Sequence, residues 1–382
     1  MLFGDILYHF YTLMNINFNP VGYQSDPVAE LIQASGYPVA KHQIITDDGY
    51  ILKVHRIPQQ NHYHKPVLLV HALSASGGQW VVNGNKSLAF MLSNSGYDVW
   101  ILHVRGTSYS LKHKYLSSNN PRFWDFSWHE IGVYDVSCTI DHILRVTGSD
   151  KIHYVGHSQG PTVLFALLSM KPEYNDKLAT AFLLQPAALV HSAYPMFKDV
   201  IQNIVQISIE RNFKKVQLQN TVSTFLAKNL CSEKPFSVLC TDLGLIFLGG
   251  DTGQIVDKHK AIHLLLRYVY DNVSIKQLIH YGQVHGSRRF QMYDYGPLIN
   301  RNIYNGSSVP PEYDLTAVRI PSFIMYGTKD TLTTETDIKQ IMKKLPNVQE
   351  VIRLPWNHGD IILGKDSDKL HSRIIKSMLK YE

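Results

Sequence analysis

The chain has 382 residues with 45% hydrophobic and 18% charged side chains, which predicts a folded protein with a large core and excludes a disordered chain. A net charge of +6 is spread along the sequence without any nucleic-acid-binding motif, so we expect no nucleic-acid partner. The 19 histidines predict a surface that becomes strongly cationic below about pH 6.

The first half of the chain alternates strand-like and helix-like segments. The expected segments are a hairpin at 42–57, a strand at 67–70, a helix near 88–92, a strand at 97–102, a helix at 130–147, a strand at 151–155, a helix at 163–168 and a strand at 180–184. This alternation predicts an α/β fold with a mostly parallel sheet that helices cover on both faces.

From about residue 186 to residue 310 the alternation stops, and the sequence becomes mostly helix-like with apolar and aromatic faces. After Pro310-Pro311 it returns with a strand at 322–327, a helix at 337–344, a strand at 348–354 and a terminal helix at 368–381. We therefore expect an α/β core of residues 27–185 and 311–382, interrupted by a helical cap of residues 186–310.

One short stretch, Gly156-His157-Ser158-Gln159-Gly160, lies between an expected buried strand and an expected helix. Strand, tight turn and helix form the setting in which the pattern G-x-S-x-G acts as a nucleophile elbow. The turn would hold Ser158 in a strained backbone conformation, and the two glycines would leave room for close packing. The motif predicts that Ser158 is a catalytic nucleophile.

A serine nucleophile needs a histidine base, and the base needs an acid that orients it. In α/β-hydrolases both follow the serine on loops after late strands. Asp330 follows the strand expected at 322–327, and His358 follows the last expected strand. We expect these two residues to complete the triad, with Asp337 as the alternative acid and a turn or helix-capping role as the alternative for Asp330.

An oxyanion hole requires two backbone N–H groups that point at the developing negative charge. Gln159 directly follows the nucleophile, and Leu73 lies in the small-residue loop after the strand at 67–70. We expect these two N–H groups to form the hole.

The cysteines and glycosylation sequons bear on the compartment. Cys231 and Cys240 flank a short loop, and a disulfide between them would indicate an oxidising environment, whereas we expect Cys138 to be a buried apolar residue. Three sequons compatible with secretion begin at Asn85, Asn272 and Asn305.

Residues 1–26 form a separate N-terminal segment. The stretch from Met1 to Met14 is rather apolar, but Asp5 and His9 interrupt it and no positive charge precedes it, so we interpret it as a poor or incomplete signal region. No run of 18 apolar residues predicts a transmembrane helix. No spacing of metal ligands and no cofactor-binding loop stands out, so we expect neither a metal nor a cofactor.

A set of longer motifs carries a family resemblance. They are Gly36-Tyr37-Pro38, Asp47-Asp48-Gly49-Tyr50-Ile51-Leu52, Gly96-Tyr97-Asp98-Val99-Trp100, Phe123-Trp124-Asp125-Phe126-Ser127-Trp128-His129-Glu130, Gly156-His157-Ser158-Gln159-Gly160, His280-Tyr281-Gly282-Gln283, Tyr293-Asp294-Tyr295-Gly296, Pro310-Pro311-Glu312-Tyr313-Asp314-Leu315 and Asn357-His358. Together they resemble the acid lipase family, which includes gastric and lysosomal acid lipases and many insect homologues. The similarity runs from about residue 27 to the end.

The resemblance implies an α/β-hydrolase fold with a cap over an apolar acyl-binding cleft. It implies a serine lipase that hydrolyses neutral lipids, triacylglycerol or cholesteryl ester, at a lipid–water interface through an acyl-enzyme, in a secreted or lysosomal protein. The positions that match the family's site are Ser158, Asp330 and His358 for the triad, Leu73 and Gln159 for the oxyanion hole, and Cys231 and Cys240 near its cap disulfide.

Four departures from the family pattern bear on rate and substrate preference. Ala72 replaces the usual glycine between histidine and leucine, which predicts an oxyanion loop less free to turn. His103-Val104-Arg105-Gly106 replaces the usual Asn-Ala-Arg-Gly, and Pro161 follows the elbow where a small or hydroxylated residue is usual. Gly359 follows His358 where an apolar residue is common.

Three other functions remain open from the sequence. A carboxylesterase for short, soluble esters would use the same triad. A non-catalytic lipid-binding protein on a lipase fold would not need to keep its nucleophile, so the intact triad argues against that role. A protease or other acyl hydrolase fits the cap and the family motifs less well.

Overall fold

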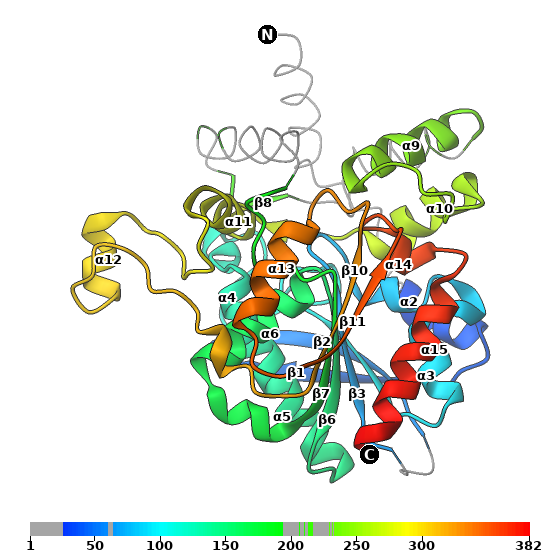
Figure 1. Ribbon diagram of the computed structural model, residues 1–382, viewed down its shortest axis with the longest axis horizontal. Coiled ribbons are helices and arrows are strands. Elements are labelled where there is room, and N and C mark those ends of the chain that lie inside the picture. Colours follow the sequence, from blue (N-terminus) through cyan, green and yellow to red (C-terminus); the bar gives the residue numbers. More distant parts are fainter. Residues whose placement is uncertain are drawn as a thin grey trace.

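The computed structural model describes residues 26–59, 64–193, 206, 210, 213–216, 229, 231 and 233–382. Residues 1–25 of the expected N-terminal segment and part of the expected cap lie outside this described part of the chain. The described chain is built around one large twisted sheet with helices on both faces (Figure 1).

The sheet is mostly parallel. Its strands, in order across the sheet, are β1 (Ala40–Ile45), β2 (Tyr50–Ile57), β4 (Val99–His103), β3 (Val67–Val70), β6 (Ile152–His157), β7 (Leu178–Leu184), β10 (Ser322–Gly327) and β11 (Val348–Leu354). The short strand β5 (Lys112–His113) pairs with β2. The pairings of β2 with β1, β4 and β5 are antiparallel, and every pairing from β4 to β11 is parallel.

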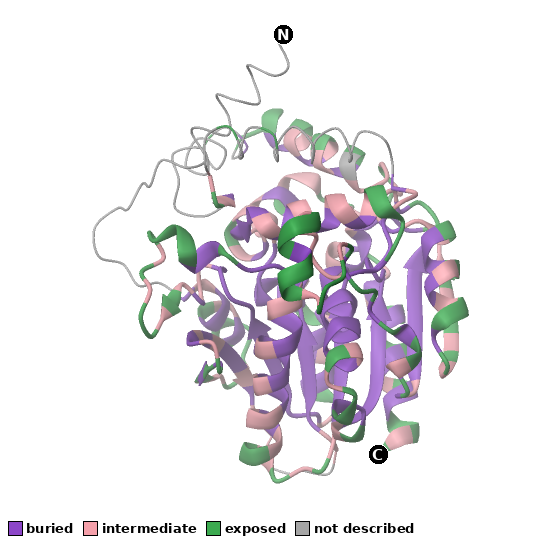
Figure 2. Ribbon diagram, turned by 90° about the vertical axis from the view of Figure 1, so that its left-hand side faces the viewer, coloured by how far each residue is buried: buried purple, intermediate pink, exposed green. Residues whose placement is uncertain are grey.

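Burial of the central strands explains their sequences. All residues of β3, β4, β6, β7 and β10 are buried, as Figure 2 shows for the middle of the sheet. Parallel strands with both faces covered are nearly continuous apolar runs, which is the pattern seen in the sequence. The edge strands β1 and β11 instead mix more exposed with less exposed positions, because only one of their faces packs on helices.

Two layers of helices cover the sheet. One face packs against α2 (Pro27–Ala34), α3 (Leu88–Asn94), α14 (Asp360–Leu363) and α15 (Ser367–Met378). The other packs against α4 (Trp128–Glu130), α5 (Ser137–Thr147), α6 (Gln159–Met170) and α13 (Glu335–Lys344). A π-helical turn at Ile131–Val136 joins α4 to α5, so the helix predicted at 130–147 is one continuous helical run.

Between β7 and β10 the chain leaves the sheet. This stretch contains α9 (Phe236–Leu248), α10 (Lys258–Leu264), a π-helical turn at Leu265–Val269, α11 (Ile275–Ser287), α12 (Pro297–Ile303) and a two-stranded sheet of β8 (Lys215–Val216) and β9 (Val273–Ser274). Figure 1 shows α9, α10 and α11 above the sheet and α12 projecting from one side. Tyr281 and Val284 of α11 are buried in the main core, so this helix packs directly on the α/β layers.

Short 3-10 helices complete the chain, at Gly77–Trp80, Gly84–Lys86, Pro121–Trp124, Pro172–Lys177, Leu315–Ala317 and Leu379–Tyr381. Every strand and helix predicted individually is present in the structure. The sequence patterns missed the short elements α2, β5, β8, β9 and α14, in which too few residues repeat to produce a periodic signal. They predicted residues 186–310 as mostly helical without giving the individual helices α9, α10, α11 and α12. Within the described residues, no helix has the length and apolar content needed to cross a membrane.

The expectation of a strongly cationic surface below pH 6 was wrong for many of the histidines. Burial is the main cause that lowers the pKa of nine of them, so they resist protonation near pH 6. These are His42, His55, His71, His103, His129, His142, His157, His280 and His371. Histidine count alone therefore overstated the charge gained on acidification.

Candidate active site

The elbow around Ser158 has the geometry that its sequence predicts. Strand β6 ends one residue before Ser158 and α6 begins one residue after it, and Ser158 has φ 56° and ψ −101°. An added Cβ on Gly156 would lie 2.7 Å from the carbonyl carbon of Gly160, and one on Gly160 would lie 2.6 Å from the Val70 oxygen. Both glycines are therefore required for this close packing, and the strained serine stands at the end of its strand.

Three loops bring Ser158, His358 and Asp330 together. His358 Nε2 lies 2.9 Å from Ser158 Oγ, and His358 Nδ1 lies 2.7 Å from Asp330 Oδ2. Because a carboxylate only accepts hydrogen bonds, Nδ1 carries the proton and Nε2 is left to accept from the serine hydroxyl. All three side chains are buried, each about 6–7% exposed. This arrangement has the donor and acceptor order of a serine hydrolase triad.

The acid loop holds the Asp330 carboxylate in place. Asp330 Oδ1 accepts hydrogen bonds from the backbone N–H groups of Leu332 and Thr333, and Oδ2 accepts one from the Thr333 hydroxyl. The alternative acid, Asp337, instead contacts His191 Nδ1 at 2.7 Å and accepts from the Ser192 N–H. Asp337 thus has other partners than His358.

A second imidazole, which the sequence did not predict at this site, lies beside His358. The His157 ring centroid is 5.0 Å from that of His358, and burial, reinforced by the nearby His358, lowers the pKa of His157 to about 3. His157 Nε2 is 2.9 Å from Gln185 Oε1, and Gln185 Nε2 donates to the Asn357 carbonyl. The elbow therefore supports the histidine loop through two side chains far apart in sequence.

The segment after α9 is tied to the histidine loop. The His358 N–H donates to the Leu248 carbonyl, and Asn357 Nδ2 donates to the Gly250 carbonyl. An added Cβ on Gly249 would lie 1.8 Å from the Lys329 oxygen, so this segment also packs closely on the acid loop. The end of α9 therefore contacts both the loop that carries Asp330 and the loop that carries His358.

The predicted oxyanion residues lie on either side of the elbow. Leu73 is in the loop after β3, and Gln159 is the first residue of α6. Neither N–H donates a hydrogen bond to another residue in the described part of the chain, so both remain able to bind an oxyanion. Ala72 does not adopt a left-handed backbone conformation, whereas Ser74 does, with φ 55°. The loop therefore turns at Ser74, and replacing glycine with Ala72 brings no backbone strain.

The stretch that precedes β9 packs against the loop of Leu73. Ala75 forms a β-bridge with Tyr270, the Ser76 N–H donates to the Val269 carbonyl, and the Asp271 N–H donates to the Ser74 carbonyl. The Asp271 carboxylate accepts from the N–H and hydroxyl of Ser108, and burial raises its pKa to about 7. The backbone contacts of residues 269–271 therefore hold one side of the loop that carries Leu73.

A cavity of about 400 Å³ opens over Ser158 and His358. Its apolar walls come from the core and from the stretch between β7 and β10, and they include Leu73, Leu245, Leu248, Ile262, Leu265, Val269, Ile362 and Leu363. Gly359 faces Leu248, because an added Cβ there would lie 2.8 Å from the Leu248 side chain. Pro161 is the third residue of α6, where a missing N–H costs no helical hydrogen bond. A cavity of this size and polarity suits an apolar ligand.

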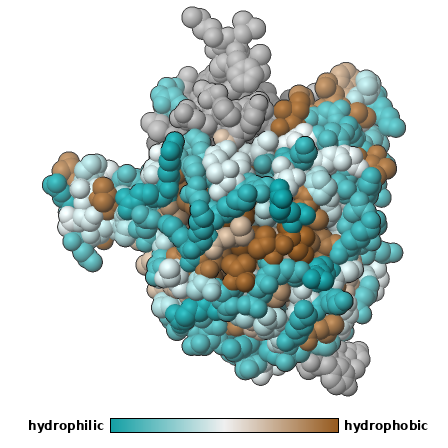
Figure 3. All heavy atoms as spheres, viewed as in Figure 1, coloured by the Kyte–Doolittle hydropathy of each residue, from teal (hydrophilic) through white to brown (hydrophobic). Residues whose placement is uncertain are grey.

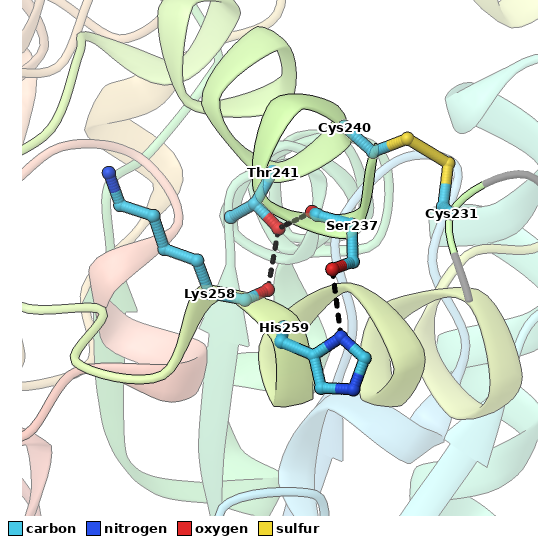
Figure 4. Close-up of a disulfide and its surroundings, with 6 residues drawn as sticks. All are labelled: Cys231, Ser237, Cys240, Thr241, Lys258 and His259. Carbon is cyan, nitrogen blue, oxygen red and sulfur yellow. Dashed lines mark hydrogen bonds between the residues drawn. A yellow bond between two sulfur atoms is a disulfide. The ribbon is translucent and has the colours of Figure 1, made fainter. Parts of the chain in front are cut away.

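The structure joins Cys231 and Cys240 in a disulfide, shown in Figure 4. Cys240 lies on α9 and lines the cavity. Further contacts tie α9 to α10: Thr241 Oγ1 donates to the Lys258 carbonyl at 2.7 Å, and Ser237 Oγ lies 2.8 Å from His259 Nδ1. These bonds stabilise the wall of the cavity that α9 supplies.

The remaining predicted residues have different environments. Cys138 is free and half-buried, and burial raises the pKa of its thiol. Asn85 and Asn305 are exposed, but Asn272 is 6% exposed. In the folded chain the sequon at Asn272 is therefore less accessible to glycosylation than the sequons at Asn85 and Asn305. Among the described residues, no three His, Cys, Asp or Glu side chains gather closely enough to hold a metal ion.

Comparison with known proteins extends this description. The family described as "Partial alpha/beta-hydrolase lipase region" matches residues 28–84, and the "alpha/beta hydrolase fold" family matches residues 65–207. Gastric triacylglycerol lipase of Mus musculus is 34% identical over 364 residues, covering 92% of this chain and 91% of that protein. Lipase 1 of Drosophila melanogaster is 35% identical over 361 residues, covering 92% of this chain and 79% of that protein.

Solved structures with lower sequence identity share the fold. A putative lipase from Acinetobacter baumannii aligns with a TM-score of 0.52 at 14% identity, covering 95% of this chain and 99% of that one. An esterase from Thermogutta terrifontis aligns with a TM-score of 0.51 at 15% identity, covering 90% and 99%. With the family match, these likenesses confirm the predicted α/β-hydrolase fold.

Proposed function

This chain belongs to the acid lipase family, and from that premise we propose that it is a serine lipase that hydrolyses neutral-lipid esters, triacylglycerol or cholesteryl ester. The observation that carries the proposal is the continuous chain of hydrogen bonds from Ser158 through His358 to Asp330 at the floor of an apolar cavity. A chain of this kind activates a serine hydroxyl for attack on an ester carbonyl.

In the first half of the reaction, Ser158 Oγ attacks the acyl carbonyl while His358 Nε2 takes the hydroxyl proton. The Asp330 carboxylate keeps the His358 ring oriented and stabilises the imidazolium that forms. The N–H groups of Leu73 and Gln159 bind the oxyanion, and one such donor is typically worth about 10²–10³-fold in kcat. His358 then gives its proton to the departing alcohol, which leaves the acyl group on Ser158.

In the second half, a water molecule replaces the alcohol. His358 takes a proton from the water as it attacks the acyl-enzyme carbonyl, and the same two N–H groups bind the second oxyanion. Collapse of this intermediate breaks the bond to Ser158 Oγ, which recovers its proton from His358. The products are a fatty acid and the free enzyme.

The residues around the cavity favour long acyl chains over short ones. Leucine, isoleucine and valine side chains from the core and from the stretch between β7 and β10 form most of the wall, which suits a long hydrocarbon chain. We assign the α/β-hydrolase core to residues 27–185 and 311–382 and the cap to residues 186–310, with the cavity between them.

The outer face of α9 supports action at a lipid–water interface. Four apolar side chains on this helix, Phe236, Leu239, Leu243 and Ile246, are each about half exposed. Figure 3 shows brown side chains gathered over this helix in the upper right of the view. Apolar residues grouped on an exposed helix face mark a surface that contacts other molecules, here the surface of a lipid droplet or micelle. The disulfide in the cap suits an oxidising compartment, so we infer a secreted or lysosomal protein.

The test is an assay of the purified protein and its Ser158→Ala variant on p-nitrophenyl esters from acetate to palmitate and on emulsified triacylglycerol and cholesteryl ester. We expect turnover of long-chain esters that the variant loses. Asn119→Ala is the control, because this residue is exposed and is not among those that line the cavity. Activity confined to the shortest esters would identify a carboxylesterase, and lipid binding without turnover would identify a lipid-binding protein.

A further inference from the structure

Two buried histidines, His55 and His103, form a chain of hydrogen bonds, called the row below, beneath the oxyanion loop, which is the loop after β3 that carries Leu73. Neither histidine lines the cavity or bonds to the triad. The Gly77 N–H donates to His103 Nδ1 at 3.2 Å. His103 Nε2 lies 2.9 Å from His55 Nδ1, and His55 Nε2 lies 3.1 Å from Asp26 Oδ2. Both imidazoles are 0% exposed. The row thus joins the loop after β3 to β4, to β2 and to the residue that precedes α2.

The chemistry of the two ends determines where each proton lies. A backbone N–H can only donate, so His103 Nδ1 must accept from Gly77, and His103 Nε2 carries the proton. His55 Nδ1 then accepts from His103, and His55 Nε2–H donates to the Asp26 carboxylate. All four ring nitrogens are used, and all bonds run in the same direction. Neither ring can therefore take up another proton without losing a bond.

The row supports the loop that carries Leu73. Gln79, two residues beyond Gly77, accepts the Ala72 N–H through its side-chain oxygen, so the loop from Ala72 to Gln79 is a closed unit. The end of β4 holds this loop at two points. The Val104 N–H donates to Nε2 of His71, the residue directly before the loop, and His103 Nδ1 accepts from the Gly77 N–H. An added Cβ on Gly77 would lie 2.9 Å from the His103 ring, which shows how closely the loop packs on it.

The surroundings of the row favour neutral imidazoles. Burial lowers the pKa of His55, which the adjoining Asp26 opposes, and burial with the neighbouring His55 holds the pKa of His103 well below its usual range. The titratable groups that face the row or its Asp26 anchor are Asp26 itself, Lys41, Lys53, His71 and Tyr109. Lys41 and Lys53 each lie 3.2 Å from Asp26 Oδ2 and partly neutralise it, so the anchor does not impose a positive charge on His55.

Resting on the proposed function, we propose that His103 is a positioning residue for ester hydrolysis: it holds the oxyanion loop through Gly77, and it does so only while His55 and His103 are both neutral. Protonation of either ring breaks a bond of the row and releases the loop that presents the Leu73 N–H. Residue 103 is one of the positions at which the chain departs from its family, which usually has asparagine in place of His103.

Two substitutions separate the two ends of the row. In His103→Asn the amide oxygen takes the place of Nδ1 and accepts from Gly77, but the residue does not titrate. We expect kcat at neutral pH within about twofold of the parent protein, because the loop stays held. In His103→Gln the longer side chain reaches His55 but leaves the Gly77 N–H without an acceptor. We expect kcat to fall about tenfold at every pH with KM nearly unchanged, since the oxyanion contact acts on the transition state.

The deciding measurement is kcat and kcat/KM for a long-chain p-nitrophenyl ester between about pH 4 and about pH 8. On the acid side we expect the parent protein to lose activity more steeply than His103→Asn, because protonation of the row releases the loop only in the parent protein. His142→Asn is the matched control, because His142 Nε2 also contacts a histidine, His42 Nδ1, at 3.1 Å, but on α5 away from the loop. This control should keep the parent slope.

Equal acid slopes in the parent and His103→Asn would overturn the proposal, and so would parental kcat in His103→Gln. Near-ultraviolet circular dichroism checks that each variant folds. If His103→Gln does not fold, the acid slope of His103→Asn alone decides between the outcomes. If the unmodified protein fails to turn over any ester, the proposed function fails and this inference falls with it. That outcome is recognised before any histidine is changed.

Discussion

Gln277 Nε2 donates a hydrogen bond of 2.9 Å to Gln159 Oε1, and both side chains are buried. Gln277 also accepts the Ser274 N–H and so caps the start of α11, while Gln159 directly follows Ser158. One side-chain contact therefore connects a helix outside the sheet to the residue whose N–H we assign to the oxyanion hole. Loss of a buried partner leaves a polar group unsatisfied, which typically costs about 1–3 kcal/mol.

We predict that Gln277→Leu lowers kcat about tenfold with a smaller change in KM, because Gln159 loses the contact that orients it. Gln283→Leu is the control on the same helix, since Gln283 bonds to the backbone of Asp294, away from the elbow. It should lose thermal stability while kcat stays within about twofold. Steady-state kinetics and thermal unfolding of both variants provide the test. Equal losses of kcat in the two variants would show that kcat depends on the packing of α11 as a whole and not on the contact between Gln277 and Gln159.

Asp330→Asn should reduce kcat on the order of 10⁴-fold while the fold persists, because an amide no longer enforces the tautomer that His358 needs. Asp337→Asn is the matched control, since its carboxylate contacts His191 and Ser192 instead. We expect its kcat to remain within about threefold of the parent value. A larger loss in Asp337→Asn than in Asp330→Asn, measured with the same ester, would reverse the assignment of the acid.

Gly132 marks a close approach between the π-helical turn and α6. An added Cβ there would lie 2.3 Å from the Val163 carbonyl oxygen. Gly132→Ala should therefore destabilise the protein by about 1–3 kcal/mol through overpacking. Gly286 on α11 has no atom within 4 Å of an added Cβ, so Gly286→Ala should be stabilising by about 0.4–1 kcal/mol. Urea unfolding of the two variants measures both values, and equal shifts would contradict the close approach.

His280 should make stability depend on pH. Its ring stacks on Trp128 with centroids 3.9 Å apart, and burial lowers its pKa to about 3. Below pH 6.5 the unfolded chain binds a proton that the folded chain does not, so this residue costs stability as the pH falls towards 3. At pH 5 the cost is about 2 kcal/mol.

His280→Gln removes this titration and also the stacking. We predict that the variant is less stable than the parent at pH 7 and that the difference narrows by about 2 kcal/mol at pH 5. Urea unfolding at the two pH values provides the test. An unchanged difference would show that His280 titrates alike in the folded and unfolded chains.

The sequence by itself predicted the central strands of the parallel sheet, because buried strands are continuous apolar runs that differ from amphipathic helices. The strained elbow at Ser158 also followed from local sequence, since glycines at fixed distances permit one tight turn. Chain order alone placed Asp330 and His358 on loops that follow late strands. The structure brings these loops beside Ser158 at the C-terminal ends of the strands.

Only the tertiary structure decided which polar groups meet across long sequence separations. His55 and His103 are 48 residues apart, and Gln159 and Gln277 are 118 residues apart. No periodic pattern encodes such pairs, because they depend on strand order in the sheet and on how α11 packs against α6. The same holds for the charge of the histidines: the sequence states their number, but burial by the folded core determines which of them bind protons.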